Sequence, residues 1–328
     1  MSNFKKILKR VLAGIGGVFL LGILGIVVKF YVLSPKSRPA PVMTAPTTAE
    51  AVERGRYLVN HVAVCAGCHS KIDETVPGEA VVDGMLGSGR DFGDIGGPIH
   101  IRAPNLTPDK DTGLGGWTDG EIARAIREGV SKDGRNLFPQ MPYLTYRETL
   151  SDGEVLDIIA YLKTLKPIKN EVGRTSVAFP VSMFVRAVPQ PLETPAPAPP
   201  SPSDKLARGK WLLRAASCNE CHDSVNERME KIPGKTLAGG FKFTLPDGRG
   251  YAIAPNITSD PATGIGSYSD EDLRRVFEQG KGKDGRDLYV MPWSFYKGMT
   301  AEDKAALIAA LREVAPVSNV VPPSAVKK

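Results

Sequence analysis

Cysteine and histidine are both scarce in this sequence, with four of each among 328 residues. All four cysteines lie in two short motifs, "CAGCH" at 65–69 and "CNECH" at 218–222. None is therefore left to build a framework of disulfides. Each motif also takes one histidine, and the two that remain, His61 and His100, are too few for a separate cluster of metal ligands.

Motifs of common catalytic sites are also missing. The sequence has no phosphate-binding glycine loop and no nucleophile elbow, and no cysteine–histidine cluster outside the two motifs. This absence argues against an enzyme with a catalytic centre of its own.

Long apolar stretches are limited to one segment, the 18 uncharged residues 11–28. As a helix this segment would be about 27 Å long, close to the thickness of the hydrocarbon layer of a bilayer. Basic residues without any acid precede it, which keeps the N-terminus in the cytoplasm and places everything after residue 33 outside. These residues are Lys5, Lys6, Lys9 and Arg10.

A cleaved signal peptide is the alternative for this segment. Such a peptide usually has a shorter apolar region and a small-x-small cleavage site close behind it, whereas "KFYVLSPKSR" follows here. We therefore expect an uncleaved anchor over residues 1–33, crossing the cytoplasmic (inner) membrane once, with the rest of the chain on the periplasmic side.

The net charge of +6 belongs to the N-terminal region. Residues 1–49 carry seven basic side chains and no acidic one, so the net charge of the remaining chain is −1. This balance argues against a nucleic-acid partner.

The rest of the chain consists of two copies of one repeated domain. "RGRYLVNHVAVCAGCH" matches "RGKWLLRAASCNECH" with one extra residue in the first copy, "APNLT" matches "APNIT", and residues 112–143 match residues 263–293. Proline-rich stretches flank the first copy. We therefore expect a linker at 34–48, a first domain at 49–168, an inter-domain linker at 169–203, a second domain at 204–318 and a tail at 319–328.

Each copy shows three helical patterns with start signals. The first copy has capping boxes at Thr47 with Glu50, Thr118 with Glu121 and Ser151 with Glu154; the second has Ser203, Ser269 with Asp272, and Thr300 with Asp303. Gly129 and Gly280 are matched helix stops, and Gly55 with Tyr57 and Gly209 with Trp211 suit a close crossing of the first and last helices. The fold class expected is all-α, with three short helices and long loops in each domain. Because such a thin core needs support, we also expect an internal cofactor.

Three kinds of site are compatible with a CxxCH motif. Structural zinc needs four ligands, and the second copy has no spare histidine to complete them. A thiol redox pair needs no histidine. Covalent c-type haem uses all three residues, two thiols for thioethers and one imidazole for iron. We therefore predict two haem c groups, attached at Cys65, Cys68, Cys218 and Cys221, with His69 and His222 as proximal iron ligands.

The sixth iron ligands are predicted from matched methionines. Met141 and Met291 lie 76 and 73 residues after the first cysteine of each motif, and each is followed by a proline. A packing role is the commoner one for a single methionine, but the duplication favours ligation. His100 and His61 are rivals for the first haem alone. A His/Met centre has no open position on iron and carries electrons.

Several matched residues are candidates for supporting the haem pockets. The carbonyls of Pro104 and Pro255 could orient the proximal imidazoles, and Asn105 and Asn256, with Thr107 and Thr258, could brace the same loops. Trp117 and Tyr268, and also Arg135 and Arg286, could bond haem propionates. Turn chemistry, core packing and a solvated loop are the respective alternatives.

On these residues the sequence resembles the cytochrome c subunit of membrane-associated quinohaemoprotein alcohol and gluconate dehydrogenases. The likeness covers residues about 50–168 and 204–315, through "CAGCH", the stretch from "APNLT" to "FPQMPY", and "LSDGEVLDIIAYLKTL". It implies a subunit that passes electrons from a dehydrogenase to the quinone pool or respiratory chain. It also implies His69 and His222 as proximal and Met141 and Met291 as distal ligands. That family carries three haem motifs, whereas two are present here.

Two other placements stay open. The di-haem subunit of cbb-type oxidases likewise has an anchor and two haem domains. A di-haem enzyme, either a peroxidase or a thiosulfate-oxidising cytochrome, is the alternative from another class. The function expected is a membrane-anchored electron relay between a dehydrogenase and a respiratory acceptor, either another cytochrome or a terminal oxidase.

Overall fold

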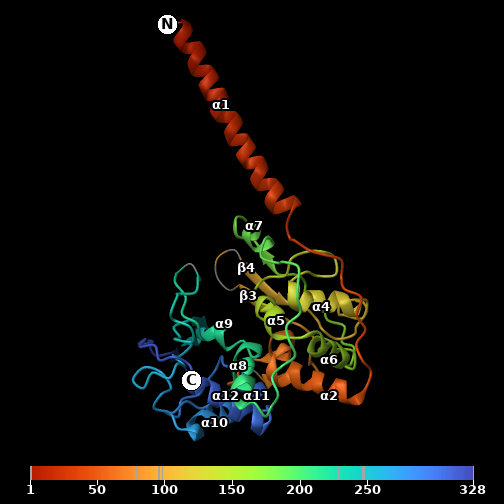
Figure 1. Ribbon diagram of the computed structural model, residues 1–328, viewed down its shortest axis with the longest axis vertical. Coiled ribbons are helices and arrows are strands. Elements are labelled where there is room, and N and C mark those ends of the chain that lie inside the picture. Colours follow the sequence, from red (N-terminus) through yellow and green to blue (C-terminus); the bar gives the residue numbers. More distant parts are fainter. Residues whose placement is uncertain are drawn as a thin grey trace.

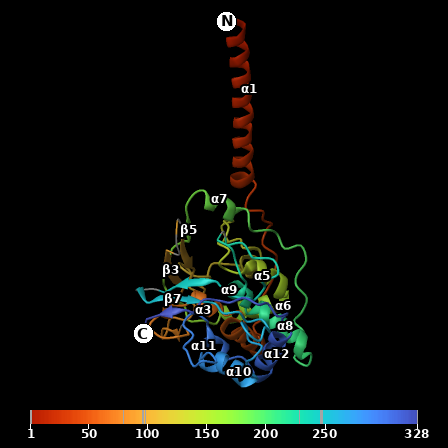
Figure 2. The same ribbon diagram turned by 90° about the vertical axis from the view of Figure 1, so that its left-hand side faces the viewer.

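The N-terminal helix stands apart from the rest of the chain in the computed structural model, which describes residues 2–78, 80–94, 97, 99–227, 229–245 and 248–327 (Figures 1 and 2). Helix α1 (Ser2–Val27) continues into a π-helical turn, η1 (Val28–Val32). Within the stretch Asn3–Val32, an 18-residue window has a mean hydropathy of 2.7, and none of that window is buried. The stretch is long and apolar enough to cross a membrane.

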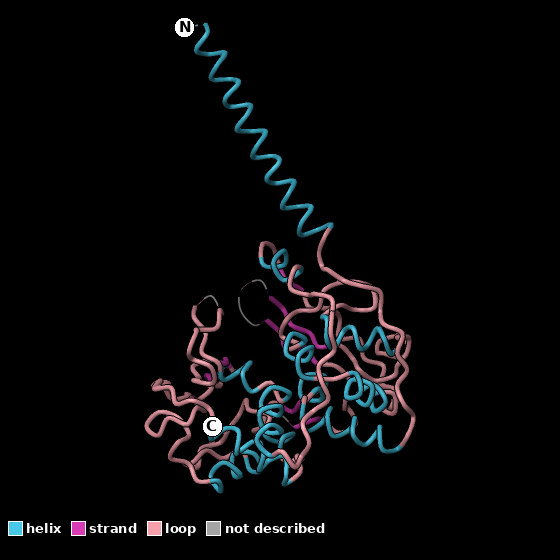
Figure 3. Tube along the Cα trace, viewed as in Figure 1, coloured by secondary structure: helices cyan, strands magenta, loops and turns pink. Residues whose placement is uncertain are grey.

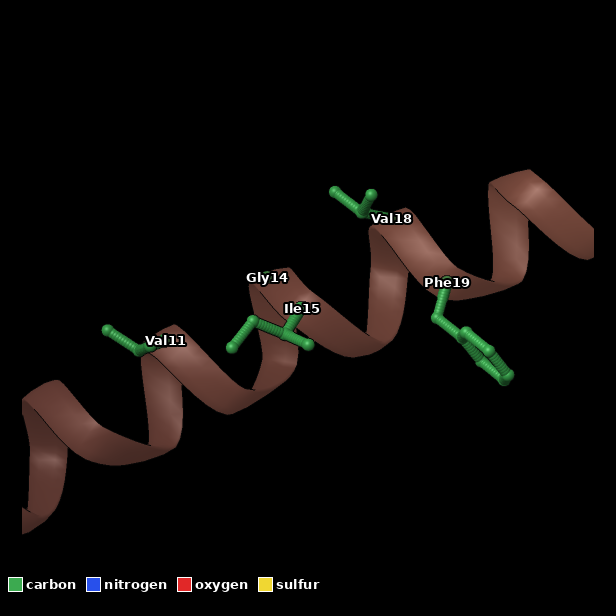
Figure 4. A pocket seen from close by; sticks show the side chains of 5 residues that line it. All are labelled: Val11, Gly14, Ile15, Val18 and Phe19. Carbon is green, nitrogen blue, oxygen red and sulfur yellow. The ribbon is translucent and has the colours of Figure 1, made fainter.

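After Arg10, the exposed surface of α1 is apolar. Figure 4 shows the side chains of Val11, Ile15, Val18 and Phe19 directed away from the helix, with Gly14 among them. Phe19 is 68 % exposed. Such a surface suits lipid rather than water.

The two sequence repeats, residues 49–168 and 204–318, are each built on helices in the same order. The first repeat contains α2 (Ala49–Tyr57), η2 (Leu58–Val62), α3 (Cys65–His69), α4 (Asp119–Glu128), α5 (Tyr143–Thr149) and α6 (Asp152–Leu162). The second contains α8 (Lys205–Ala215), α9 (Cys218–His222), α10 (Asp270–Gln279), α11 (Trp293–Tyr296) and α12 (Ala301–Arg312). A further short helix, α7 (Val181–Arg186), lies in the connecting segment.

Short strands accompany the helices, so the all-α expectation is incomplete (Figure 3). One antiparallel sheet has the order β3-β4-β5 and a second has the order β6-β7-β8, while β1 pairs with β2. The strands are β1 (Ile72–Asp73), β2 (Ala80–Val81), β3 (Arg90–Asp94), β4 (Ile99–Ala103), β5 (Ser176–Val177), β6 (Lys242–Thr244), β7 (Gly250–Ile253) and β8 (Ala325–Val326). Each three-stranded sheet is completed by a strand that follows the last helix of its repeat. This long-range pairing has no local signal in the sequence.

Most of the predicted helix boundaries are correct. Thr118, Ser151 and Ser269 form capping boxes, and Gly129 and Gly280 end their helices in the left-handed conformation. The first helix of each repeat begins one residue later than expected. Thr48 caps α2 in place of Thr47, and Asp204 caps α8 in place of Ser203. The side-chain oxygen of each capping residue accepts a hydrogen bond from the backbone amide three residues further along the chain.

The first and last helices of each repeat cross in close contact at a glycine. A Cβ atom on Gly55 would lie 1.8 Å from the carbonyl oxygen of Asp157, and one on Gly209 would lie 1.9 Å from that of Ala306. Both glycines have helical backbones, so they are present for space rather than for conformation. Tyr57 and Trp211 reach across to the other repeat instead.

We expect Gly55→Ala to destabilise the protein by about 2 kcal/mol or more, because the added methyl group must push α2 away from α6. Thermal or denaturant unfolding of the full-length protein measures this. Gly153→Ala is the matched control on α6, since nothing but the Ser151 hydroxyl, at 3.8 Å, approaches its Cβ position; its effect should stay within about 0.5 kcal/mol. Equal losses in the two variants would contradict the steric explanation.

Matched aromatic residues form hydrogen bonds across the interface of the two repeats in both directions. The indole Nε1 of Trp211 donates to the carbonyl of Thr149 at 2.8 Å. At the matched position of the first repeat, the hydroxyl of Tyr57 donates to Asp303 at 2.8 Å and accepts from the amide of Thr300 at 3.2 Å. Buried apolar residues of both repeats form one continuous core.

The first repeat accommodates its one extra residue in the π-helical turn η2. A π-turn is the expected result of a single insertion into an α-helix. It places His61 against the second repeat, where its Nδ1 lies 2.9 Å from the carbonyl oxygen of Phe295. A Cβ on Gly298 would lie only 2.2 Å from the imidazole. His61 is therefore an interface residue.

Candidate haem-binding sites

Each CxxCH motif forms one turn of helix that begins at its first cysteine. The residues just before these turns, Val64 and Ser217, have φ values of 50° and 54°. This left-handed conformation is unfavourable for both residue types, and its presence at matched positions shows that the surrounding fold enforces it. On such a turn the first cysteine, the second cysteine at i+3 and the histidine at i+4 share one face. The three side chains of a motif can therefore meet one planar group.

The motif imidazoles are held by the carbonyls that the sequence suggested. Nδ1 of His69 lies 2.8 Å from the carbonyl oxygen of Pro104, and Nδ1 of His222 lies 2.8 Å from that of Pro255. A carbonyl only accepts, so Nδ1 carries the proton and the lone pair remains on Nε2. Burial lowers the pKa of both imidazoles, which keeps them neutral. Both are therefore prepared as metal ligands through Nε2.

A buried amide fixes each of these carbonyls in place. Asn105 donates to the Ile168 carbonyl at 2.7 Å, and its side-chain oxygen accepts from the amide and hydroxyl of Thr107. Asn256 makes the same bonds to Val317, at 2.8 Å, and to Thr258. The network ties the "APN" loop to the segment after the last helix, so both repeats use one device to position the imidazole.

The first thiol of each motif lacks the lowered pKa of a reactive redox cysteine. Burial raises the pKa of Cys65 and of Cys218 to about 12, whereas a reactive CxxC cysteine has a lowered pKa. The four cysteines form no disulfide. In the described part of the chain, no group of three or more histidine, cysteine or carboxylate side chains could hold a metal ion. Thiol redox chemistry and structural zinc both fit poorly.

The matched methionines occupy equivalent loops. Met141 and Met291 are half-buried against the core, and each accepts a 2.8 Å hydrogen bond at its carbonyl from the amide two residues on. Pro142 and Pro292, which follow them, have almost the same backbone angles, with φ near −80° and ψ near 50°. The Met141 and Met291 loops thus have the same conformation, which agrees with the same function for both methionines.

Two further features fit a large internal group in each repeat. In the first repeat, the hydroxyl of Tyr143 is completely buried and has no hydrogen-bond partner among the described residues, and burial raises its pKa. A buried orphan hydroxyl costs free energy unless something accepts from it. Trp117 and Tyr268 are partly buried against the core at matched positions. Together with the motif cysteines and the oriented imidazoles, these residues fit haem c.

The two rival histidines are engaged elsewhere. His100 lies on β4, where Asp91 and Asp94 contact its two ring nitrogens at 2.7 and 2.9 Å. His61 contacts the second repeat. Neither ring has a nitrogen free to approach the first motif in this arrangement, which leaves Met141 as the better candidate.

A pair of tyrosines went unnoticed in the sequence. The hydroxyls of Tyr146 and Tyr296 donate at 2.9 Å to the carbonyls of Ala63 and Ala216, two residues before each motif. Both rings are buried, and burial raises the pKa of both hydroxyls. The sequence signal for this pair is their equal spacing from the matched methionines Met141 and Met291.

Both motifs also contact the opposite repeat. Thr145 donates to Glu220, within the second motif, at 2.9 Å. The ring of Phe295 lies 3.3 Å from the Cβ position of Gly67, within the first motif. The interface therefore joins the two motifs through the helices that follow the methionine loops.

Comparisons with known proteins agree with this chemistry. The family model described as Cytochrome c matches residues 52–166. The fructose dehydrogenase cytochrome subunit of Gluconobacter japonicus is 32 % identical over 73 % of this chain and 47 % of its own length. The gluconate 2-dehydrogenase cytochrome c subunit of Pantoea cypripedii is 30 % identical over 70 % of this chain and 51 % of its own.

A relative closer in length is the "Diheme cytochrome c-type" protein of Cereibacter sphaeroides. It is 31 % identical over 66 % of this chain and 70 % of its own length. The chain thus spans about half the length of the dehydrogenase subunits that it matches and most of this relative.

Proposed function

The chain belongs to the cytochrome c family, and from that premise we propose that it is a membrane-anchored di-haem cytochrome c that relays electrons from a dehydrogenase to a respiratory acceptor. The matched pair of buried imidazoles, each with Nδ1 fixed 2.8 Å from a proline carbonyl, carries this proposal. The repetition of the whole arrangement supports two haem sites. Covalently bound haem c supplies one-electron iron chemistry.

The roles of the residues follow from their places. Cys65 and Cys68, and Cys218 and Cys221, would hold the two haems by thioethers. His69 and His222 would bind iron through Nε2, and the half-buried Met141 and Met291 would complete the axial pairs. A thioether ligand raises the reduction potential.

The repeat interface supports a relay within one molecule. Residues of both motifs, Gly67 and Glu220, contact the opposite repeat, and His61 and Trp211 bond across the same surface. The interface is buried and continuous with the core. Such a packed junction would keep the two sites next to each other, which favours electron transfer between them.

The partners are proposed from the names of the relatives. Cytochrome subunits of fructose and gluconate dehydrogenases are among them, which supports a dehydrogenase as the donor. The acceptor is proposed to be another cytochrome or a terminal oxidase. The apolar α1 and its basic flank support anchoring in the inner membrane, with both repeats on the periplasmic side.

Ligand-binding spectroscopy on the full-length, haem-loaded protein tests this function. We expect two haems per chain, both low-spin, with absorption spectra that carbon monoxide and hydrogen peroxide leave unchanged, because methionine fills each sixth position. A haem that binds either ligand readily, with peroxide turnover, would show that the protein is an enzyme of the peroxidase class instead.

A further inference from the structure

A basic pocket lies where the membrane anchor meets the first repeat. Its volume is about 210 Å³. Three arginines, Arg135, Arg174 and Arg186, line it together with Tyr31 from the end of the apolar helix. They come from three separate segments: the loop after α4, the chain leading to β5, and α7. The fold therefore gathers positive charge that is dispersed in the sequence.

This positive charge is only partly neutralised. Asp133 is the one carboxylate that is ion-paired with these arginines in the described part of the chain, 3.0 Å from Nη2 of Arg174 and 3.5 Å from Nε of Arg135. Arg186 donates its Nε to the neutral carbonyl of Ser34 at 2.8 Å. Three cations thus face a single anion.

Arg135 is the least satisfied of the three. Its Nε is buried and has no hydrogen-bond partner among the described residues, with the Asp133 carboxylate 3.5 Å away. Burial lowers the pKa of its guanidinium, Asp133 offsets part of this effect, and repulsion from Arg174 lowers the pKa further. A second anion in the pocket would relieve both costs, as a buried or crowded cation is stabilised by a paired acceptor.

The surroundings of the pocket are those of a membrane interface. Phe30 in η1 packs edge-to-face on Phe184 of α7, with ring centroids 5.8 Å apart, and Arg186 stacks over Tyr31. Phe184 and the neighbouring Phe179 remain 58 % and 72 % exposed. Figure 1 shows α7 beside the lower end of α1. Aromatic residues at the end of a spanning helix lie at headgroup level.

We propose that this pocket binds the headgroup phosphate of an anionic phospholipid from the membrane that α1 spans. The inference rests on the membrane anchoring of the proposed function, and not on its redox part. Bidentate arginine–phosphate bonds match the fork of each guanidinium. The exposed phenylalanines accommodate the acyl chains, and the lipid fixes α7 and the first repeat against the bilayer.

A lipid titration of the full-length, haem-loaded protein in neutral detergent micelles tests the site. The probes are short-chain phosphatidylglycerol and its phosphatidylcholine analogue, and the measurement is the thermal unfolding midpoint. Phosphatidylglycerol should raise the midpoint in a saturable manner, because it binds the folded state, whereas phosphatidylcholine should not.

Arg174→Gln with Arg186→Gln should weaken this apparent affinity about ten-fold or more, since charge-assisted hydrogen bonds are lost. Arg286→Gln is the control, because Arg286 is an arginine of the second repeat that does not line the pocket and pairs with Asp284 at 3.0 Å. It should respond like the unmodified protein. Unfolding midpoints without lipid show whether the variants are folded.

Three results would overturn the proposal. The first is an equal shift of the unfolding midpoint with both lipids. The second is an unchanged response to phosphatidylglycerol in the double variant. The third is an unmodified protein that does not respond to phosphatidylglycerol, together with a haem spectrum that the double variant alters. The last result would assign the arginines to a haem propionate of the first repeat. The ligand spectroscopy described above can succeed or fail independently of each of these.

Discussion

Replacing Cys65 and Cys68 together by alanine should leave the full-length protein with one covalently bound haem in place of two. The matched double variant at Cys218 and Cys221 should give the same loss, and the four-fold variant should bind none. The reason is that each thioether pair belongs to one repeat, and no other cysteine exists in the chain to replace it.

Haem per chain after denaturation, measured against protein concentration, gives the answer directly. Unfolding of each variant supplies a second measurement, since the repeat without its haem keeps only a thin core of short helices. Because the two repeats share one continuous core, the loss of either haem should lower the unfolding midpoint of the whole protein. A chain that holds stoichiometric zinc, or a first double variant that still carries two haems, would contradict the assignment.

The sequence predicts the helical frame of this protein well, because the signals of that frame are local. The capping side chains of Thr118, Ser151 and Ser269 bond to amides three residues away, and the helix stop at Gly129 depends on one backbone angle. The glycine crossings at Gly55 and Gly209 were found because the repeat presents the same pattern twice.

The strands were missed because their pairing is not local. β3 is only five residues long and includes charged residues and a glycine, and β5 joins the sheet from beyond the last helix of its repeat. Hydrophobic alternation over so few residues is too weak to predict a strand. The same holds for α7, a six-residue helix in a segment expected to be a linker.

The candidate sites, too, are predictable from the sequence only where their signals are local or repeated. The motif residues and the "APN" loops were found in the sequence because spacing and repetition mark them. The environment of His100 was not, since Asp91 reaches it only through the bulged register of β3 and β4. Docking of the repeats, with Tyr146 and Tyr296 behind the motifs, depends on surfaces whose residues have no common period along the chain.

Met141→Leu should remove about half of the sulfur-to-iron charge-transfer band of the oxidised protein, and Met291→Leu the other half. Leucine fills nearly the same volume, so a core position loses less than about 1.5 kcal/mol of stability. It has no lone pair for iron, however. One haem in each variant should then bind carbon monoxide, and its reduction potential should fall, because a thioether ligand keeps that potential high.

Met299→Leu provides the control for these variants. Met299 is 4 % exposed in the core of the second repeat, so its replacement disturbs packing at least as much as the others do. It lies eight residues beyond Met291 and has no matched methionine in the first repeat. The charge-transfer band of the Met299→Leu variant should be intact. If the band survives in full in both Met141→Leu and Met291→Leu, the sixth ligands are not these methionines. The near-identical loops before α5 and α11 would then serve packing alone, and the argument for a closed, electron-carrying iron centre would fail with them.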